Sequence, residues 1–204
     1  PRNDIKMDPR LAEHQTLKMK NCQRMIAGKS NHFCGGLAKF TRIFYNPLSD
    51  DDIYGLHETF RTMIRVRNIL YNVDAEFTIN GPEKGLYSMT RVQHYPRGGG
   101  FFADHSDTYS AQMPSIASLE GYLQIILVMM DRGEFYETGG AYVKFDGAII
   151  DIDKISKTGD LVVYNGQTVH GVEDIDPMAP IDMFERSGRL AGFATLGKDW
   201  TIST

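Results

Sequence analysis

The sequence is poor in cysteine, with two in 204 residues, and has no apolar run long enough to span a bilayer. Cys22 and Cys34 are too few for a disulfide framework and lie in no CxxC motif. We therefore expect free thiols in a reducing compartment, although oxidation could join them. The 22 Lys and Arg do not outnumber the 26 Asp and Glu, which argues against a general nucleic-acid binder.

The start of the chain also lacks a signal-peptide pattern. Residue 1 is proline rather than methionine, so an N-terminal or targeting segment could have been lost before it. We expect a cytoplasmic protein with no membrane or nucleic-acid partner, and the sequence does not indicate an oligomeric state. Its 42% hydrophobic and 24% charged residues are ordinary for a globular protein, and its length predicts a single domain over residues 1–204.

Helical signals dominate before residue 85. The capping run Ser49–Asp52 is followed by apolar residues at helical spacing from Ile53 to Ile69, and Leu11–Met25 indicates a second helix. Residues 1–85 are thus predicted to be mostly helical. A small basic cluster within this part could meet an anionic small substrate: Arg61, Arg65 and Arg67.

Short strands and turns dominate after residue 85. Eight segments have strand character: Ser88–Tyr95, Phe101–His105, Gly121–Met130, Ala141–Phe145, Ala148–Ile152, Leu161–Tyr164, Gln167–Val172 and Arg189–Leu196. Asp146-Gly147 and Asn165-Gly166 each predict a tight hairpin. With no helix between the strands, residues 86–200 are predicted to form a mainly β, cupin-like double-stranded β-helix (jelly roll), with the front helices packed outside.

Three residues of this half form a candidate metal site. His105 and Asp107 are two apart, so in a strand both point to the same face. His170 ends a later predicted strand. Two His and one carboxylate leave coordination positions open on one side of a metal, which is the facial triad of non-haem iron(II) oxygenases.

An arginine follows these three candidate ligands in the sequence. Arg189 opens the last predicted strand, and a guanidinium buried there needs a partner, which a dicarboxylic co-substrate supplies. Arg186 is a rival for this role. The segment Glu173–Ser187 is predicted to be a loop over the pocket mouth.

The ordered motifs resemble those of the 2-oxoglutarate/iron(II) dioxygenase family. The motifs run from about residue 88 to 196, roughly half the chain, in this order: Arg91–Pro96, His105-Ser106-Asp107, the turns Gly139–Tyr142 and Gly159-Asp160, His170, and Arg189. The resemblance implies that Fe(II) is held by the two His and Asp107. It also implies that the distal carboxylate of 2-oxoglutarate is held by Arg189 and Tyr95.

The implied reaction uses O2, releases succinate and CO2, and usually hydroxylates the substrate. Because Asp107 is present where halogenating relatives have a small residue, hydroxylation, desaturation or ring closure is favoured. The chain departs from the small-molecule branch at Arg189-Leu190-Ala191, where that branch usually has Arg-x-Ser.

The substrate is open at this point. A small molecule, such as an amino acid or a biosynthetic intermediate, is the leading hypothesis, and a peptidyl hydroxylase of the prolyl-hydroxylase kind is the alternative. Arg91, Gln93 and Phe102 are candidates for the substrate pocket, and each also fits an ordinary strand surface or core position. A non-catalytic cupin-like binding domain and an oxidase that uses no keto acid are the other classes.

Overall fold

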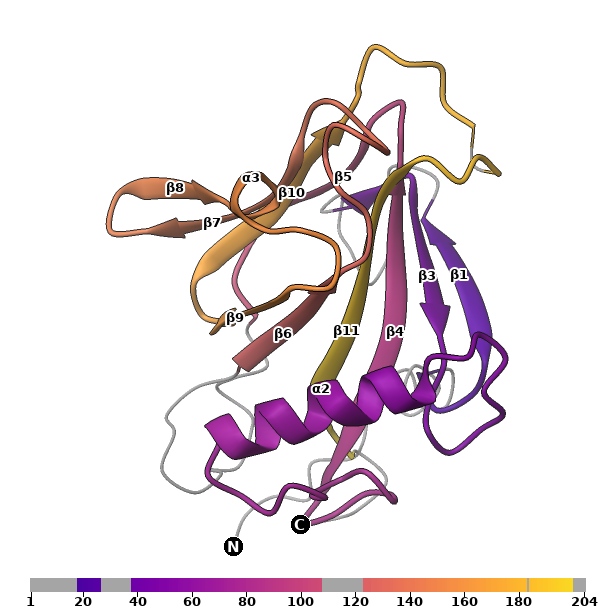
Figure 1. Ribbon diagram of the computed structural model, residues 1–204, viewed down its shortest axis with the longest axis vertical. Coiled ribbons are helices and arrows are strands. Elements are labelled where there is room, and N and C mark those ends of the chain that lie inside the picture. The colour runs from indigo at the N-terminus through magenta and orange to yellow at the C-terminus, as the bar shows by residue number, and fades with distance from the viewer. Residues whose placement is uncertain (1–17, 27–37, 108–122, 183, 200–204) are drawn as a thin grey trace, which may run out of the picture.

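The computed structural model describes residues 18–26, 38–107, 123–182 and 184–199. This part consists mainly of strands in two antiparallel sheets (Figure 1). The larger sheet has the order β1 (Cys22–Ile26), β3 (Thr41–Tyr45), β4 (Leu86–Pro96), β11 (Gly188–Lys198), β6 (Leu123–Val128) and β9 (Leu161–Asn165). The smaller sheet has the order β2 (Ala38–Lys39), β5 (Gly100–His105), β10 (Val169–Ile175), β7 (Gly140–Phe145) and β8 (Ala148–Asp151).

The long strands β4 and β11 form the centre of the larger sheet and pair along their whole length. Their alternation gives the sheet two different faces. Polar and aromatic side chains occupy the inner face, where Arg189 is opposite Tyr95 and Phe193 is opposite Arg91. Apolar residues such as Val92 occupy the outer face.

The helix α2 (His57–Leu70) covers part of this outer face and crosses β6, β11 and β4 in Figure 1. Phe60, Met63 and Ile64 pack in one cluster with Val92 of the sheet. The carboxylate of Asp52 accepts hydrogen bonds from the first backbone N–H groups, at 2.9 and 3.1 Å. The predicted helix is therefore confirmed, but its start was wrong, because Ile53 precedes it. Ile69 lies within the helix but is 66% exposed, so it is not part of the buried face.

The prediction of a mostly helical front half is wrong for the described residues. They include β1, β2 and β3, and β1 begins at Cys22, within the last part of the second predicted helix. The spacing of apolar residues there was misleading because β1 is an edge strand with one half-buried face, which carries only a short pattern. Residues 11–17 lie outside the described part.

One of the two predicted hairpins is confirmed. β7 and β8 pair around Asp146 and Gly147, which both have positive φ. The second is wrong, because β9 pairs with β6 in the larger sheet while β10 pairs with β5 and β7 in the smaller one. Neither Asn165 nor Gly166 has the positive φ that such a hairpin requires. The chain crosses between sheets at this turn, which places His170 opposite β5.

Two further expectations concern thiols and membranes. Cys22 is a free, half-buried thiol, and Cys34 lies outside the described residues. Within the described ranges, no helix combines the length and the apolar character that a membrane crossing needs.

Candidate metal centre

The two histidines meet because their strands are neighbours. His105 ends β5, His170 lies near the start of β10, and the two are direct partners in the antiparallel register. Direct partners project to the same face of a sheet, and here the ring centroids are 4.2 Å apart. Asp107 follows β5 by two residues, and its backbone N–H donates to the carbonyl of Gly166 at 2.8 Å.

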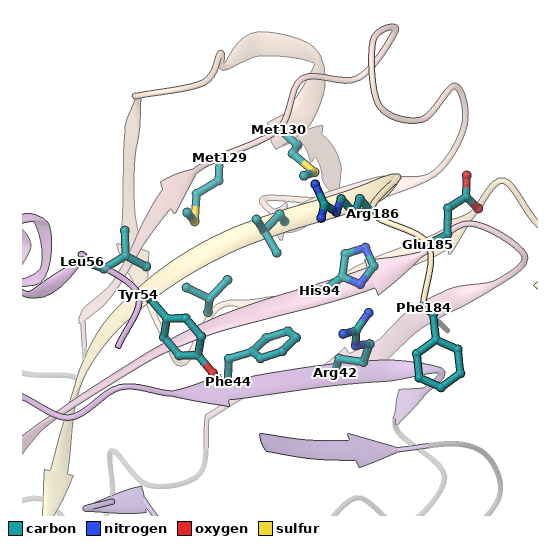
Figure 2. Close-up of a pocket in the computed structure, with 12 residues that line it drawn as sticks. Arg42, Phe44, Tyr54, Leu56, His94, Met129, Met130, Phe184, Glu185 and Arg186 are labelled. Atoms are coloured by element: carbon teal, nitrogen blue, oxygen red, sulfur yellow. The ribbon is translucent and has the colours of Figure 1, made fainter. Parts of the chain in front are cut away.

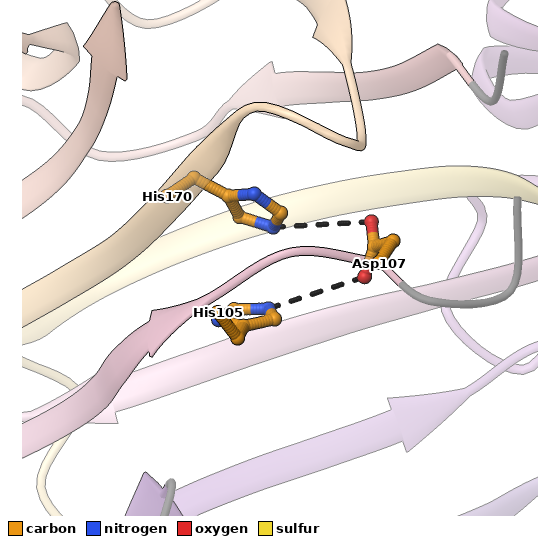
Figure 3. A group of neighbouring side chains, drawn as sticks. All are labelled: His105, Asp107 and His170. Atoms are coloured by element: carbon orange, nitrogen blue, oxygen red, sulfur yellow. Dashed lines mark ion pairs between the residues drawn. The ribbon is translucent and has the colours of Figure 1, made fainter.

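The three side chains converge on one point (Figure 3). Nε2 of His105 lies 4.0 Å from Oδ1 of Asp107, and Nε2 of His170 lies 3.8 Å from Oδ2. All three candidate ligand atoms lie within 4.8 Å of one another. Two atoms that are each about 2.1 Å from one ion are at most ~4.2 Å apart, so a small contraction is enough for them to share a metal.

The strand backbones set which ring nitrogen faces the centre. Nδ1 of His105 lies 2.9 Å from the carbonyl oxygen of Ala103, and Nδ1 of His170 lies 2.7 Å from that of Thr168. An Nδ1–H that donates to a carbonyl leaves the lone pair of Nε2 toward Asp107. Burial and the neighbouring His170 lower the pKa of His105, which favours the neutral imidazole that binds metals.

A glutamine that sequence reasoning missed supports the carboxylate. Nε2 of Gln124, on β6, donates to Oδ2 of Asp107 at 2.5 Å. The side chain is buried, and its Oε1 has no hydrogen-bond partner among the described residues. The reverse amide orientation would place two oxygens together, so the hydrogen bond fixes the amide. The signal for Gln124 was its position as the polar residue inside an otherwise apolar strand.

A cavity of about 500 Å³ between the two sheets opens onto this centre. Eight of the residues that the sequence singled out line it: Arg91, Gln93, Tyr95, Phe102, His105, Asp107, His170 and Arg189. The volume lies in the usual range for small-molecule sites.

Arg189 has a protein partner that the sequence analysis did not foresee. Its Nε and Nη2 donate to Oδ2 and Oδ1 of Asp153 at 2.7 and 3.2 Å, and both side chains are 2% exposed. Burial alone would raise the pKa of Asp153, but Arg189 and hydrogen bonds from Ala141 N and Tyr136 Oη lower it. Among the described residues, Nη1 of Arg189 makes no hydrogen bond, so it remains available to a ligand in the cavity.

Tyr95 and Arg91 lie on the same inner face. The hydroxyl of Tyr95 donates to Oε1 of Gln93 at 3.3 Å, and its ring centroid is 5.7 Å from Cζ of Arg189. Nη1 of Arg91 donates to Oγ1 of Thr195 at 2.8 Å. Phe102 stacks against His105 with centroids 4.5 Å apart.

Arg186 does not reach this cavity. It lines a separate pocket of about 420 Å³ on the outer face of the larger sheet, together with Phe184 and His94 (Figure 2). The idea of a loop over the cavity mouth is therefore wrong for the described residues, since none from 176–182 or 184–187 lines the cavity. The loop packs on the outer face because β11 turns its even-numbered side chains, such as Leu190, to that side.

The basic cluster of α2 does not face the cavity either. Arg65 pairs with Glu76 at 2.6 Å and with Glu58, and Arg61 also pairs with Glu58. Arg67 is buried and donates to Ala194 O and to neighbouring polar side chains. The cluster therefore does not line this cavity, because its members pair with Glu58 and Glu76 or are buried against β11.

Comparison with known proteins finds matches among solved structures. No family model matches the chain, and no curated protein sequence matches it. The crystal structure of a prolyl-4-hydroxylase from Pseudomonas putida is similar to it, with a TM-score of 0.51 and 17% sequence identity. The match covers 82% of this chain and 77% of that one. At this identity the similarity shows a shared fold.

Proposed function

We propose that the chain is an Fe(II)- and 2-oxoglutarate-dependent oxygenase. The observation that carries the proposal is the convergence of His105, Asp107 and His170 on the wall of a cavity that also holds Arg189. The two antiparallel sheets with the cavity between them fit a double-stranded β-helix, and the likeness to a prolyl-4-hydroxylase supports that fold.

The donor set fits iron. Two neutral imidazoles and one carboxylate leave several coordination positions open, whereas a structural metal site is closed by protein ligands. Bound Fe(II) would supply the activation of O2 for oxidative decarboxylation of the keto acid. The protein's part is to hold the three ligands on fixed strands, and Gln124 would restrain the rotation of Asp107.

Arg189 would bind the distal carboxylate of 2-oxoglutarate through Nη1, beside the hydroxyl of Tyr95. Because Asp153 already occupies Nε and Nη2, it fixes the plane of the guanidinium before the ligand arrives. The same pairing offsets the charge of Arg189. Hydrogen bonding rather than net charge would therefore dominate the contact between Arg189 and the distal carboxylate of 2-oxoglutarate. A non-catalytic cupin-like domain has no use for such an arrangement.

For the substrate, we propose hydroxylation of a C–H bond in a small molecule. A cavity of about 500 Å³ has room for 2-oxoglutarate and a compact second molecule. Peptidyl hydroxylation is the second candidate, favoured by the fold similarity to a prolyl-4-hydroxylase.

The test is succinate formation. The purified chain with Fe(II) and 2-oxoglutarate in air should produce succinate slowly without a substrate, because many such reactions run uncoupled. Asp107→Ala should lower the rate at least tenfold, and Arg189→Met should raise the KM for 2-oxoglutarate. Arg186→Met is the matched control on the outer face and should leave both unchanged. Absence of succinate from the wild type, or equal effects at Arg186 and Arg189, would contradict the proposal.

A further inference from the structure

Two arginines line the cavity, and only one of them has a counter-ion there. Arg189 is paired with Asp153. Arg91 instead donates Nη1 to the neutral hydroxyl of Thr195, and no carboxylate lies within ion-pair distance of it among the described residues. Its Cζ lies 4.7 Å from the ring centroid of Phe193, so the guanidinium is supported by a flat apolar surface. Arg91 is therefore an oriented cation whose charge is not neutralised by the described protein.

Two more basic residues lie near Arg91. The strand register aligns Arg24 with Ile43 and Ile43 with Gln93, so Arg24 lies on the same inner face as Arg91. Lys18, just before β1, is close enough to both arginines to respond to them. Burial, and then the charges of Arg91 and Arg24, lower the pKa of Lys18 to about 7. Near pH 7 Lys18 is therefore about half neutral, and of these three residues Arg91 lines the cavity.

The position of Arg91 separates it from the co-substrate site. Its strand partner Phe193 lies four residues from Arg189 along β11, which corresponds to about 13 Å. A five-carbon keto acid that reaches from the metal centre to Arg189 has no need of a second cation at that distance. Arg91 is thus placed for a different anion in the same cavity.

We propose that Arg91 binds a carboxylate or phosphate group of the substrate. This inference rests on the proposed oxygenase function, and it narrows the substrate to an anionic small molecule. Thr195 and Phe193 act as positioning residues, because they hold the guanidinium from one edge and one face. Among the described residues, Nε and Nη2 of Arg91 donate no hydrogen bond, and this edge suits the fork geometry of either oxyanion.

The test uses inorganic phosphate and acetate as probes of the two anion classes. Each is titrated calorimetrically into the chain saturated with Mn(II) and 2-oxoglutarate, so that the metal and Arg189 are already occupied. At least one probe should bind the wild type, and Arg91→Gln should weaken it at least tenfold. Arg91→Lys keeps the charge but loses the guanidinium fork, so its probe affinity should lie between those of the wild type and Arg91→Gln. The preferred probe identifies the anionic group of the substrate.

Controls keep this outcome separate from the oxygenase proposal. Arg186→Gln removes an arginine from the outer face and should leave probe affinity unchanged. The affinity for 2-oxoglutarate, measured in the same samples, should change less than twofold in Arg91→Gln. If the wild type binds no 2-oxoglutarate, the oxygenase proposal fails, and titration of the unloaded chain still tests Arg91. Absence of probe binding in the wild type, or equal binding in a folded Arg91→Gln, would overturn the inference.

Discussion

The hydrogen bond from Gln124 to Asp107 is the best evidence that the two histidines and Asp107 form a preorganised candidate metal site and not a chance grouping of side chains. The amide of Gln124 restrains Asp107 from outside the ligand set, while its own Oε1 is buried without a partner among the described residues. Groups that orient a metal ligand in this way typically contribute 10–100-fold to metal affinity. The unused Oε1 is an acceptor that a metal-bound water or a substrate donor could satisfy, since buried acceptors without partners are costly.

We therefore predict that Gln124→Leu weakens Mn(II) binding about 10–100-fold, as measured by calorimetry. The fold should persist, because leucine has a similar volume and the neighbours in β6 are apolar. The matched control is Gln23→Leu on the exposed side of β1, which should bind Mn(II) as the wild type does. Equal affinities for all three proteins would show that Gln124 has no role at the centre.

Asp153 supports Arg189 from inside the fold, and its loss would leave a buried, unpaired guanidinium. We predict that Asp153→Asn lowers the free energy of unfolding by about 3–5 kcal/mol at pH 7, the usual effect of breaking a buried pair. Urea unfolding measures this change. A loss below about 1 kcal/mol would mean that the pair is not formed in solution.

The same pair makes stability depend on acid pH. The pKa of Asp153 in the folded chain is below its ordinary value near 4. Its contribution is thus complete above pH 4 and is lost as the pH falls through the lowered folded pKa. Urea unfolding from pH 6 to pH 3 should show a smaller loss of stability in Asp153→Asn than in the wild type. Parallel curves would contradict the assigned shift.

At the scale of elements, the backbone at the start of β11 has little room for a side chain. Gly188 has φ of +119°, and a Cβ there would lie 2.3 Å from the carbonyl oxygen of Tyr95. This close approach is what allows Arg189 to pair directly opposite Tyr95. A side chain at Gly188 would push β11 away from β4 and displace the guanidinium.

We predict that Gly188→Ala costs about 2–4 kcal/mol of stability, combining left-handed strain with overlap. It should also raise the KM for 2-oxoglutarate. Gly147→Ala in the β7–β8 turn is the control, because that position has φ of +76° but open space around its Cβ. Its cost should be only about 1–2 kcal/mol, without a change in KM. Thermal unfolding and succinate kinetics measure both, and equal costs would show that crowding at Gly188 is unimportant.

The elements that the sequence predicted correctly are those whose structure is determined by residues close together in the sequence. β4 and β11 have long alternating patterns, and Asp146-Gly147 has its own turn chemistry. Asn165-Gly166 has the same local chemistry, yet it joins two sheets. The choice between hairpin and crossover depends on which distant strands β9 and β10 pair with, and a local pattern does not contain that information.

The candidate site also combines features that follow from local sequence with features that depend on contacts between distant parts of the chain. His105 and Asp107 could be paired from their spacing, and their convergence with His170 required only that the strands be neighbours. Asp153 and Gln124 were missed because each reaches the site from an element remote in sequence from its partner.

At the scale of the whole molecule, the two faces of the larger sheet have different tasks. The outer face packs against α2 and forms the stable core, while the inner face carries the polar residues of the cavity. The candidate metal centre is built on the smaller sheet and the candidate co-substrate arginine on the larger one. The proposed function would therefore require the two sheets to keep their relative positions, and Asp153 is expected to contribute to both stability and site geometry.

The most direct measurement of the proposed chemistry is an anaerobic absorption titration. Fe(II) and 2-oxoglutarate added to the wild-type chain without O2 should give the weak visible band of a metal–keto acid chelate. Asp107→Ala should abolish the band, Arg189→Met should shift its appearance to higher 2-oxoglutarate concentrations, and Arg186→Met should match the wild type. Absence of the band in the folded wild-type chain, at saturating Fe(II) and 2-oxoglutarate, would contradict the assignment of this centre to a 2-oxoglutarate-dependent oxygenase.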